Sequence, residues 1–296
     1  MSGRREAHFL SIADWSRDSL TRLLDLADAM KGGRAGGDRP LSGRTLGMVF
    51  AKSSTRTRVS FEVGMYELGG HALFLSSADI QLGRGETISD TARVLSRYVD
   101  AVMIRTFAQS DVLAFAEAGS VPVINALTDR YHPCQVMSDL MTVREEYGTL
   151  DGLVVAWIGD GNNMANSWLN ASARFGFELR LACPAGYEPN AEDMARAGRS
   201  TTVCLVRDPE EAVRGARVVT TDVWASMGQE GEAEERRHAL RTYRVDQDLM
   251  ALSNDAIFLH CLPAHRGEEV TDDVMDGPRS RVWDEAENRL HFQKAL

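Results

Sequence analysis

The chain has 296 residues, of which 44% are hydrophobic and 26% charged, and its formal net charge is −10. This composition is ordinary for a globular protein, and the length suggests about two domains of ~150 residues each. The acidic balance argues against general binding to nucleic acid or to an anionic membrane, because both are polyanions. No apolar run approaches the ~20 residues that cross a bilayer, so we expect a cytoplasmic protein.

The four cysteines do not suggest a metal site or a disulfide framework. Cys134, Cys183, Cys204 and Cys261 are widely separated, and none belongs to a C-x-x-C pair. Such pairs are typical of zinc and dithiol sites, and four thiols in a chain of this length do not resemble a small secreted scaffold. We therefore expect no bound metal and treat each cysteine by its local context.

Helices and short apolar runs alternate through the first half of the chain. Helical spacing of leucines predicts a helix from about residue 14, which ends before the glycine-rich loop 32–37. The apolar runs that predict buried strands are 45–50, 101–104 and 121–124. Helices are expected at 59–68, 111–118 and 133–147, the last because Pro133 favours a first helical turn.

A second series of apolar runs follows, separated by helical stretches. The runs are 153–158, 179–182, 202–206, 217–220 and 256–259. Alternation of this kind predicts parallel sheets with helices on both faces, and two series predict two α/β domains linked by interdomain helices. We place residues 1–135 with 284–296 in one domain and residues 136–283 in the other.

The segment Ser53 to Arg58 has the composition of an anion-binding helix start. It follows the first predicted strand, where ligands of α/β sheets bind, and it combines hydroxyl side chains with Arg56 and Arg58. A helix N-terminus offers unpaired N–H groups and a partial positive charge, and arginine can fork onto two phosphate oxygens. Three hydroxyls and two arginines in six residues favour a phosphate site over a simple helix cap.

Two other classes of function remain open on these patterns. Gly159-Asp160-Gly161 begins like a dinucleotide-binding motif, but Met164 stands at its last glycine position, so a nicotinamide-dependent dehydrogenase is disfavoured. A two-domain, non-catalytic sensor of small anions or amino acids is compatible with the fold, since fold does not fix function.

Four motifs in order resemble the aspartate and ornithine carbamoyltransferases over residues 8–296. They are Ser54-Thr55-Arg56-Thr57-Arg58, Arg105-Thr106, His132-Pro133-Cys134-Gln135 and, as in the ornithine branch, His260-Cys261-Leu262-Pro263. Each motif alone is weak, but four in register are specific. Two positions depart from the family pattern: Ala51 stands where many members have an acidic residue, and the chain ends somewhat early.

The resemblance implies a site for carbamoyl phosphate. Ser54, Thr55, Arg56 and Thr57 would hold the phosphate, and Arg105 would bridge the phosphate and the carbonyl oxygen. His132 would donate to the carbonyl oxygen, where negative charge grows in the transition state. Gln135 and the Leu262 carbonyl would hold the carbamoyl NH2 group, and Arg289 would return to the carbamoyl group. Gln81 would reach the phosphate of a neighbouring subunit, which implies a homotrimer with shared active sites.

The resemblance also implies an ornithine site. Asp222 and Ser226, in a D-x-x-x-S-M-G loop, would take the α-ammonium group, while the Met227 N–H and Asn163 would take the carboxylate. Cys261 would lie near the δ-amine and interact with Asp222, orienting the amine rather than forming a covalent intermediate.

The expected activity is carbamoyl transfer from carbamoyl phosphate to the δ-amine of L-ornithine, giving L-citrulline in arginine metabolism. No cofactor is needed, because the arginines supply the charge that Mg²⁺ supplies elsewhere. Closely related alternatives are transfer to putrescine or to an N-acylated ornithine. Asp222, Ser226 and Met227 favour free ornithine, whose α-groups they would hold.

Overall fold

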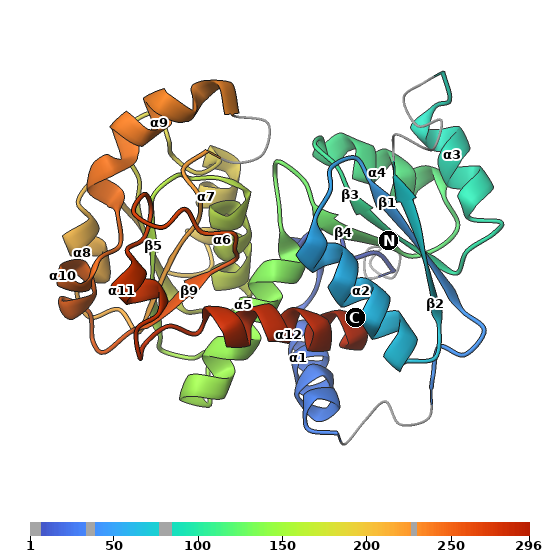
Figure 1. Ribbon diagram of the computed structural model, residues 1–296, viewed down its shortest axis with the longest axis horizontal. Helices are drawn as coiled ribbons and strands as arrows, with labels where there is room; N and C mark the ends of the chain where they lie inside the picture. Colours follow the sequence, from blue (N-terminus) through green and yellow to red (C-terminus); the bar gives the residue numbers. More distant parts are fainter. Residues whose placement is uncertain (1–6, 34–38, 77–84, 226–229) are drawn as a thin grey trace. The chain divides into compact units, whose positions relative to one another are not determined.

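The computed structural model describes residues 7–33, 39–76, 85–225 and 230–296. The chain divides into two compact units, Met1–Ser138 with Asn288–Leu296, and Asp139–Glu287. Each unit contains one parallel sheet with helices around it (Figure 1). The chain crosses between the units inside two helices, α5 (Pro133–Tyr147) and α12 (Val282–Ala295). The predicted two-domain α/β fold with linking helices is therefore confirmed.

The sheet of the first unit has the strand order β2-β1-β3-β4, with every pair parallel. Its strands are β1 (Thr45–Phe50), β2 (His71–Ser76), β3 (Ala101–Arg105) and β4 (Val123–Leu127). The β3–β4 register shifts between Ile104 and Arg105. On the β4 side, Phe9 forms an isolated parallel bridge to Ile124.

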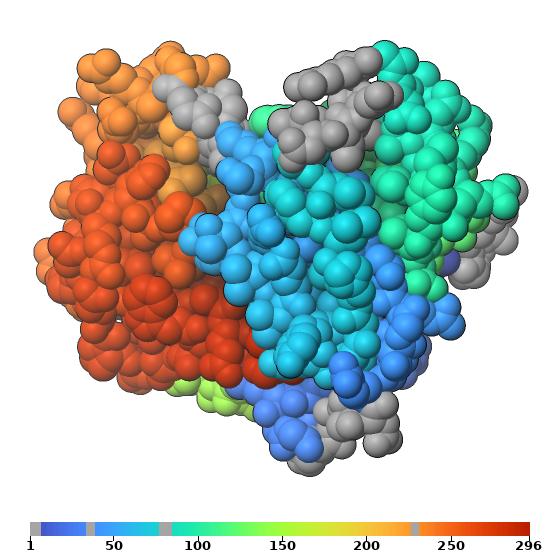
Figure 2. Space-filling view, turned by 45° about the vertical axis from the view of Figure 1, so that its right-hand side comes forward, coloured from blue at the N-terminus to red at the C-terminus, as the bar shows by residue number. Residues whose placement is uncertain are grey.

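The first unit contains the helices α1 (Arg17–Lys31), α2 (Thr55–Glu67), α3 (Ile88–Leu95) and α4 (Gln109–Ala118), preceded by the short 3₁₀ helix η2 (Ile12–Asp14). Helices α1, α2 and α3 begin at side-chain caps, whereas α4 follows Ala108 without one. The caps Ser16, Ser54 and Thr87 each accept a hydrogen bond from the N–H three residues on, which satisfies a donor that the helix leaves open. Figure 2 shows α2 at the surface, in light blue.

The sheet of the second unit has the order β7-β6-β5-β8-β9 and is also entirely parallel. Its strands are β5 (Val154–Ile158), β6 (Glu178–Ala182), β7 (Val203–Val206), β8 (Val218–Thr221) and β9 (Ile257–His260). The strand order reverses direction at β5, between β6 and β8. Ligands of open α/β sheets bind beyond the carboxyl ends of strands at such a switch point.

The remaining helices are short apart from α6. They are α6 (Asn163–Phe175), α7 (Ala191–Ala197), α8 (Pro209–Val213), α9 (Ala233–Leu240), α10 (Gln247–Ala251) and α11 (Asp272–Met275), with 3₁₀ helices η3 (Glu230–Glu232) and η4 (Arg241–Tyr243). Among the described residues, no helix has the length and apolar character required to cross a membrane.

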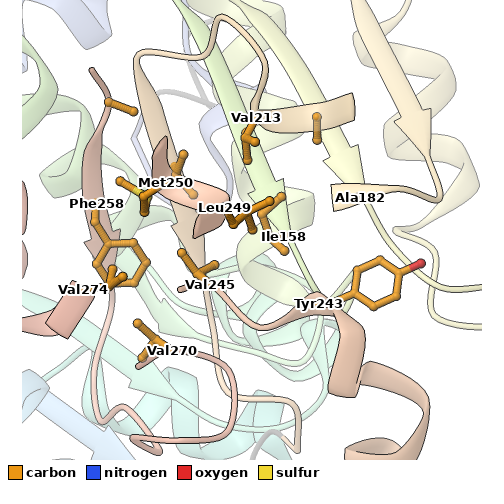
Figure 3. Packing of buried hydrophobic residues seen from close by; sticks show 14 of the residues in the cluster. Ile158, Ala182, Val213, Tyr243, Val245, Leu249, Met250, Phe258, Val270 and Val274 are labelled. Carbon is orange, nitrogen blue, oxygen red and sulfur yellow. The ribbon is translucent and has the colours of Figure 1, made fainter. Parts of the chain in front are cut away.

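An apolar cluster between strands and helices forms a core of the second unit. Ile158 and Phe258 contribute from the sheet, and Leu249, Met250 and Val274 from α10 and α11 (Figure 3). Ile158 and Phe258 are completely buried. Since burial of such a side chain stabilises by about 1.5–3 kcal/mol, this cluster fixes the strands whose ends carry the polar segments described below.

The sequence-based prediction differs from the structure in two kinds of place. It omitted the edge strand β2 and the eight-residue helix α3, both of which lack a long periodic pattern. It also placed some boundaries wrongly. Helix α2 begins at Thr55 rather than Val59, because Ser54 caps it, and β4 begins at Val123, after Pro122, which has no N–H for the ladder.

Two leucines that are paired across neighbouring strands of the second unit test how burial differs between those strands. Leu181 on β6 and Leu205 on β7 are register partners, yet Leu181 is fully buried and Leu205 is 37% exposed. Leu181→Ala should lower the free energy of unfolding by about 2–5 kcal/mol, and Leu205→Ala by less than about 1 kcal/mol. Urea denaturation measures both, and equal losses would contradict this description.

Candidate active site

Three strand ends of the first unit place the residues predicted to bind carbamoyl phosphate. The segment after β1 leads into the Ser54 cap of α2, Arg105 is the last residue of β3, and His132 follows β4. Because these strands are parallel neighbours, their carboxyl ends lie at one edge of the sheet. A residue near the end of the chain, Arg289 on α12, joins them there.

The start of α2 is organised by hydroxyl groups. Ser54 Oγ accepts from the Thr57 N–H at 3.3 Å and donates to Thr57 Oγ1 at 3.1 Å. Arg289 Nη2 also donates to Thr57 Oγ1, at 2.8 Å, and Thr57 is completely buried. A hydroxyl that joins residue 57 to residue 289 holds α12 against the helix start, even though the chain ends soon afterwards.

The charges of three guanidinium groups act on His132. Burial lowers the pKa of its imidazole well below 6.5, and the charges of Arg289, Arg105 and Arg56 lower it further. We call these four residues the arginine cluster. Arg105, His132 and Arg289 are all buried. An imidazole in this environment is neutral at physiological pH and can donate a hydrogen bond without carrying charge.

The first turn of α5 completes this edge of the sheet. Gln135 is buried there. Cys134 is also buried, and its Sγ donates to the Asn125 carbonyl at 3.5 Å. Burial raises the pKa of the Cys134 thiol to about 12, so it stays a protonated, small packing residue.

The two arginines of the helix-start segment have different surroundings. Arg56 acts on His132 as part of the arginine cluster. Arg58 instead donates from Nε to Glu62 at 2.9 Å, and its guanidinium lies 3.9 Å from the centroid of the Phe74 ring. The expectation that both arginines serve one anion therefore fits the position of Arg56, while Arg58 contacts its own helix and β2.

In the second unit, Asp222 is the centre of a hydrogen-bonded group after β8. Its Oδ2 accepts from Asn162 Nδ2 at 2.7 Å, and its Oδ1 accepts from Cys261 Sγ at 3.1 Å. Oδ1 also accepts from the Val223 N–H at 2.8 Å. Three donors orient one carboxylate, which is the type of group that binds an ammonium ion. We call Asn162, Asp222 and Cys261 the Asp222 group.

The Cys261 thiol is protonated at neutral pH. Burial raises its pKa well above 9, and the negative charges of Asp222 and Glu285 raise it further. A reactive cysteine needs the opposite environment, with positive neighbours that favour the thiolate. The structure therefore agrees with a thiol that orients a neighbouring group and does not act as a nucleophile.

A buried histidine fixes the loop after β9. His260 Nδ1 accepts from the Leu262 N–H at 2.9 Å, so its other ring nitrogen carries the proton and donates to Glu269 Oε1 at 3.1 Å. The His260 N–H donates to Glu285 at 2.8 Å. Leu262 has a φ of 58°, an unfavourable value for a non-glycine residue, which this network supports.

Within the described ranges, two groups of three side chains have metal-ligand spacing. They are Asp222, His260 and Cys261, and His265, Glu268 and Glu269. In the first group both ring nitrogens of His260 are already hydrogen-bonded, and Cys261 donates to Asp222. The second group is partly exposed, and Glu268 pairs with Arg237 at 3.2 Å. Neither arrangement indicates a bound metal ion.

Gln81, Ser226 and Met227 lie outside the described residues. Asn163 is the first residue of α6, directly after the Asn162 cap. Sequence reasoning did not find Asn162 or Glu269. The cap role of Asn162 can be read from its place before a helix, but its bond to Asp222 joins residues 60 positions apart and has no local signal.

Two family models cover almost the whole chain. The model described as "Aspartate/ornithine carbamoyltransferase, carbamoyl-P binding domain" matches residues 7–145, and the model described as "Asp/Orn binding domain" of the same enzymes matches residues 151–296. The chain therefore belongs to the aspartate/ornithine carbamoyltransferase family, as its motifs predicted.

Similar proteins include several ornithine carbamoyltransferases. The chain is 56% identical over 294 residues to an ornithine carbamoyltransferase of Geobacter metallireducens, covering 98% of this chain and 97% of the relative. It is 56% identical to the anabolic ornithine carbamoyltransferase of Pseudomonas aeruginosa, covering 98% and 95%. The solved ornithine carbamoyltransferase from Pyrococcus furiosus matches with a TM-score of 0.92 at 51% identity, covering 97% and 95%.

The arginine cluster makes a prediction about His132. Because its pKa lies well below 6.5, the ring in the ligand-free protein should stay neutral as the pH falls from 8 through 6.5. Nitrogen-15 NMR of the imidazole distinguishes the neutral from the charged form, and His238, exposed on α9, provides an internal comparison. A His132 titration centred near 6.5 would show that the guanidinium groups do not act on the ring as described.

Proposed function

We propose that this chain works in the cytoplasm and transfers the carbamoyl group of carbamoyl phosphate to the δ-amine of L-ornithine, giving L-citrulline and phosphate. The reaction belongs to arginine metabolism. We place it in arginine biosynthesis because the Pseudomonas aeruginosa relative is named as the anabolic enzyme. The observation that carries the proposal is the arginine cluster: three guanidinium groups around a neutral histidine, beside a helix start. That combination suits a substrate with a phosphate and an adjacent carbonyl.

On the donor side, the phosphate would lie at the start of α2. Ser54, Thr55 and Thr57 offer hydroxyls and N–H groups there, and Arg56 offers a forked, charged donor. Arg105 would bridge the phosphate and the carbonyl oxygen. A phosphate dianion beside the half-buried Arg56 and the buried Arg105 would offset much of their mutual repulsion.

The carbonyl would be activated by hydrogen bonding. As the amine attacks, negative charge develops on the carbonyl oxygen, and the neutral His132 would donate to it together with Arg105. A preorganised donor of this type is typically worth about 10²–10³ in rate. The Gln135 side-chain oxygen and the Leu262 carbonyl would accept from the carbamoyl NH2 group, and Arg289 would donate to the carbamoyl group. The C–O bond to phosphate then breaks, and phosphate leaves as HPO4²⁻ with the proton that the attacking amine releases. Arg56 and Arg105 would balance its charge.

On the acceptor side, Asp222 supplies the negative charge for the α-ammonium group, and Ser226 would add a hydroxyl. Asn163 and the Met227 N–H would take the carboxylate. The δ-amine has an ordinary pKa of about 10.4, so it must lose a proton before it attacks. Cys261, a protonated thiol bonded to Asp222, would orient this amine.

We further propose that the protein is a homotrimer in which Gln81 of each subunit reaches the phosphate site of a neighbour. An apolar stripe on α2 supports an interface close to that site. Val59, Val63 and Tyr66 lie four and three residues apart, hence on one helix face, and all three are exposed. Large exposed apolar groups at helical spacing are typical of surfaces that a partner covers.

A direct assay separates the alternatives for the acceptor. With carbamoyl phosphate, citrulline should form from L-ornithine. Putrescine, which lacks the α-carboxylate, and N-acetylornithine, which lacks the free α-ammonium group, should react roughly 10- to 100-fold more slowly, because each loses one charge contact worth about 1.5–3 kcal/mol. If putrescine or N-acetylornithine reacts faster than L-ornithine, that compound is the acceptor and the assignment of ornithine is wrong. Binding of both ligands without any product would favour the sensor.

A matched pair of arginines tests the phosphate site. Arg56→Ala should weaken carbamoyl phosphate binding roughly 10- to 100-fold, because it removes a charge-assisted donor. Arg58→Ala, two residues away, should change it by less than about threefold, since Arg58 contacts Glu62 and Phe74. Calorimetric titration measures both affinities. Equal losses in the two variants would contradict the assignment of the site to Arg56.

A further inference from the structure

A buried ion pair lies beside the Asp222 group but has no role in the reaction proposed above. Arg236 on α9 donates from Nη1 to Asp160 Oδ2 at 3.0 Å, and both side chains are about 10% exposed or less. The Arg236 guanidinium also lies 5.2 Å from the centroid of the Tyr187 ring. Removing two charges from water is costly, so a pair at this depth needs further contacts to be stable.

The same guanidinium nitrogen makes one of those contacts with the strand end that carries Asp222. Arg236 Nη1 donates to the Trp224 carbonyl at 3.3 Å, two residues beyond Asp222. The Trp224 side chain is buried and approaches Gly159 at the end of β5. Arg236 therefore bonds both the Asp160 side chain and the Trp224 carbonyl, and in this way it fixes the backbone that follows β8.

Asp160 itself is anchored. Trp157 Nε1 donates to the Asp160 carbonyl at 3.0 Å, and the next residue, Gly161, donates its N–H to the Tyr187 carbonyl at 2.8 Å. These bonds hold Asp160 in place after β5, where the strand order reverses. Arg236, which bonds Asp160, therefore holds the chain after β8 in a fixed position relative to β5.

We infer that Asp160 and Arg236 are positioning residues for the amino-acid acceptor: their ion pair holds the Asp222–Trp224 backbone so that the Asp222 carboxylate meets the acceptor's α-ammonium group. This inference rests on the proposed function, since it needs an acceptor with that group. Neither residue touches the reacting atoms, so loss of the pair should weaken acceptor binding far more than it slows turnover at saturation.

The charges around Asp160 add a pH dependence. Burial raises the pKa of its carboxyl to about 6, against the effect of Arg236, and the negative charges of Asp222 and Glu232 raise it further. Cys183, after β6, faces the same carboxyl. Above pH 6 the carboxylate is charged and the pair is intact. As the pH falls below about 6, Asp160 gains a proton and its hold on Arg236 weakens.

L-Norvaline is a suitable probe, because it is ornithine without the δ-amine. It keeps both α-groups, it cannot accept the carbamoyl group, and no titrating amine near pH 6 complicates its binding. Its Kd is measured by calorimetry on the wild-type protein saturated with carbamoyl phosphate, at pH values from 5.5 to 7.5. In parallel, ornithine KM and kcat are measured at pH 7.5 for the wild type and variants.

Asp160→Asn and Arg236→Gln should each raise ornithine KM and norvaline Kd roughly 10-fold, with kcat changed by less than about threefold. Arg236→Lys, which keeps the charge, should recover part of the loss. Arg281→Gln is the matched control: Arg281 also pairs with a carboxylate, Glu146, and bonds two backbone carbonyls, and it has no contact with the Asp222 group. It should leave both constants within about twofold.

The wild-type Kd for norvaline should increase as the pH falls from 7.5 to 5.5, and Asp160→Asn should remove most of that increase. A flat wild-type profile would overturn the inference, as would variants whose donor affinity and kcat fall in parallel with acceptor affinity. If the wild type makes citrulline but the variants bind norvaline normally, only this inference fails. If the wild type makes no citrulline, the proposed function fails first.

Discussion

Parallel strand pairing is the constraint on which both sites depend. In a parallel sheet all strands end at the same edge, so segments far apart in sequence meet there without any further device. In the first unit this brings together the start of α2, Arg105 and His132; in the second it brings together Asn162, Asp222 and Cys261. Buried apolar strands thus determine where the polar chemistry lies.

The two groups differ in how they manage buried charge. The charges around His132 are positive and keep its ring neutral, so that the ring proton serves for hydrogen bonding. Around Cys261 they are negative, and the response is a thiol that keeps its proton. The lowered pKa of His132 makes its ring a weak base, and a protonated Cys261 thiol is a poor nucleophile, so neither group is suited to proton abstraction or covalent attack. The reaction is left to positioning and to preorganised charge.

The sequence predicted every described strand except β2, together with the donor motifs and the alternation that defines the fold, because each of these is a local pattern. Composition alone could not separate Arg56 from Arg58, although the family resemblance assigned the phosphate to Arg56. The sequence could not show that Arg58 contacts Glu62 and Phe74. It also could not find Asp160 and Arg236, which are 76 residues apart and share no motif. The dinucleotide-like glycines have a packing explanation: a Cβ on Gly161 would lie 2.1 Å from the Pro189 nitrogen, so that glycine serves a close backbone approach.

The raised pKa of Cys261 also affects how the protein withstands oxidants. Peroxides attack thiolates far faster than thiols, and the first oxidised product, a sulfenic acid, forms from the anion. A cysteine beside Asp222 and Glu285 presents almost none of that anion at neutral pH. The chain can therefore keep sulfur at the centre of a polar site, with its weak donor capacity and small volume, while avoiding the redox sensitivity that usually accompanies a functional cysteine.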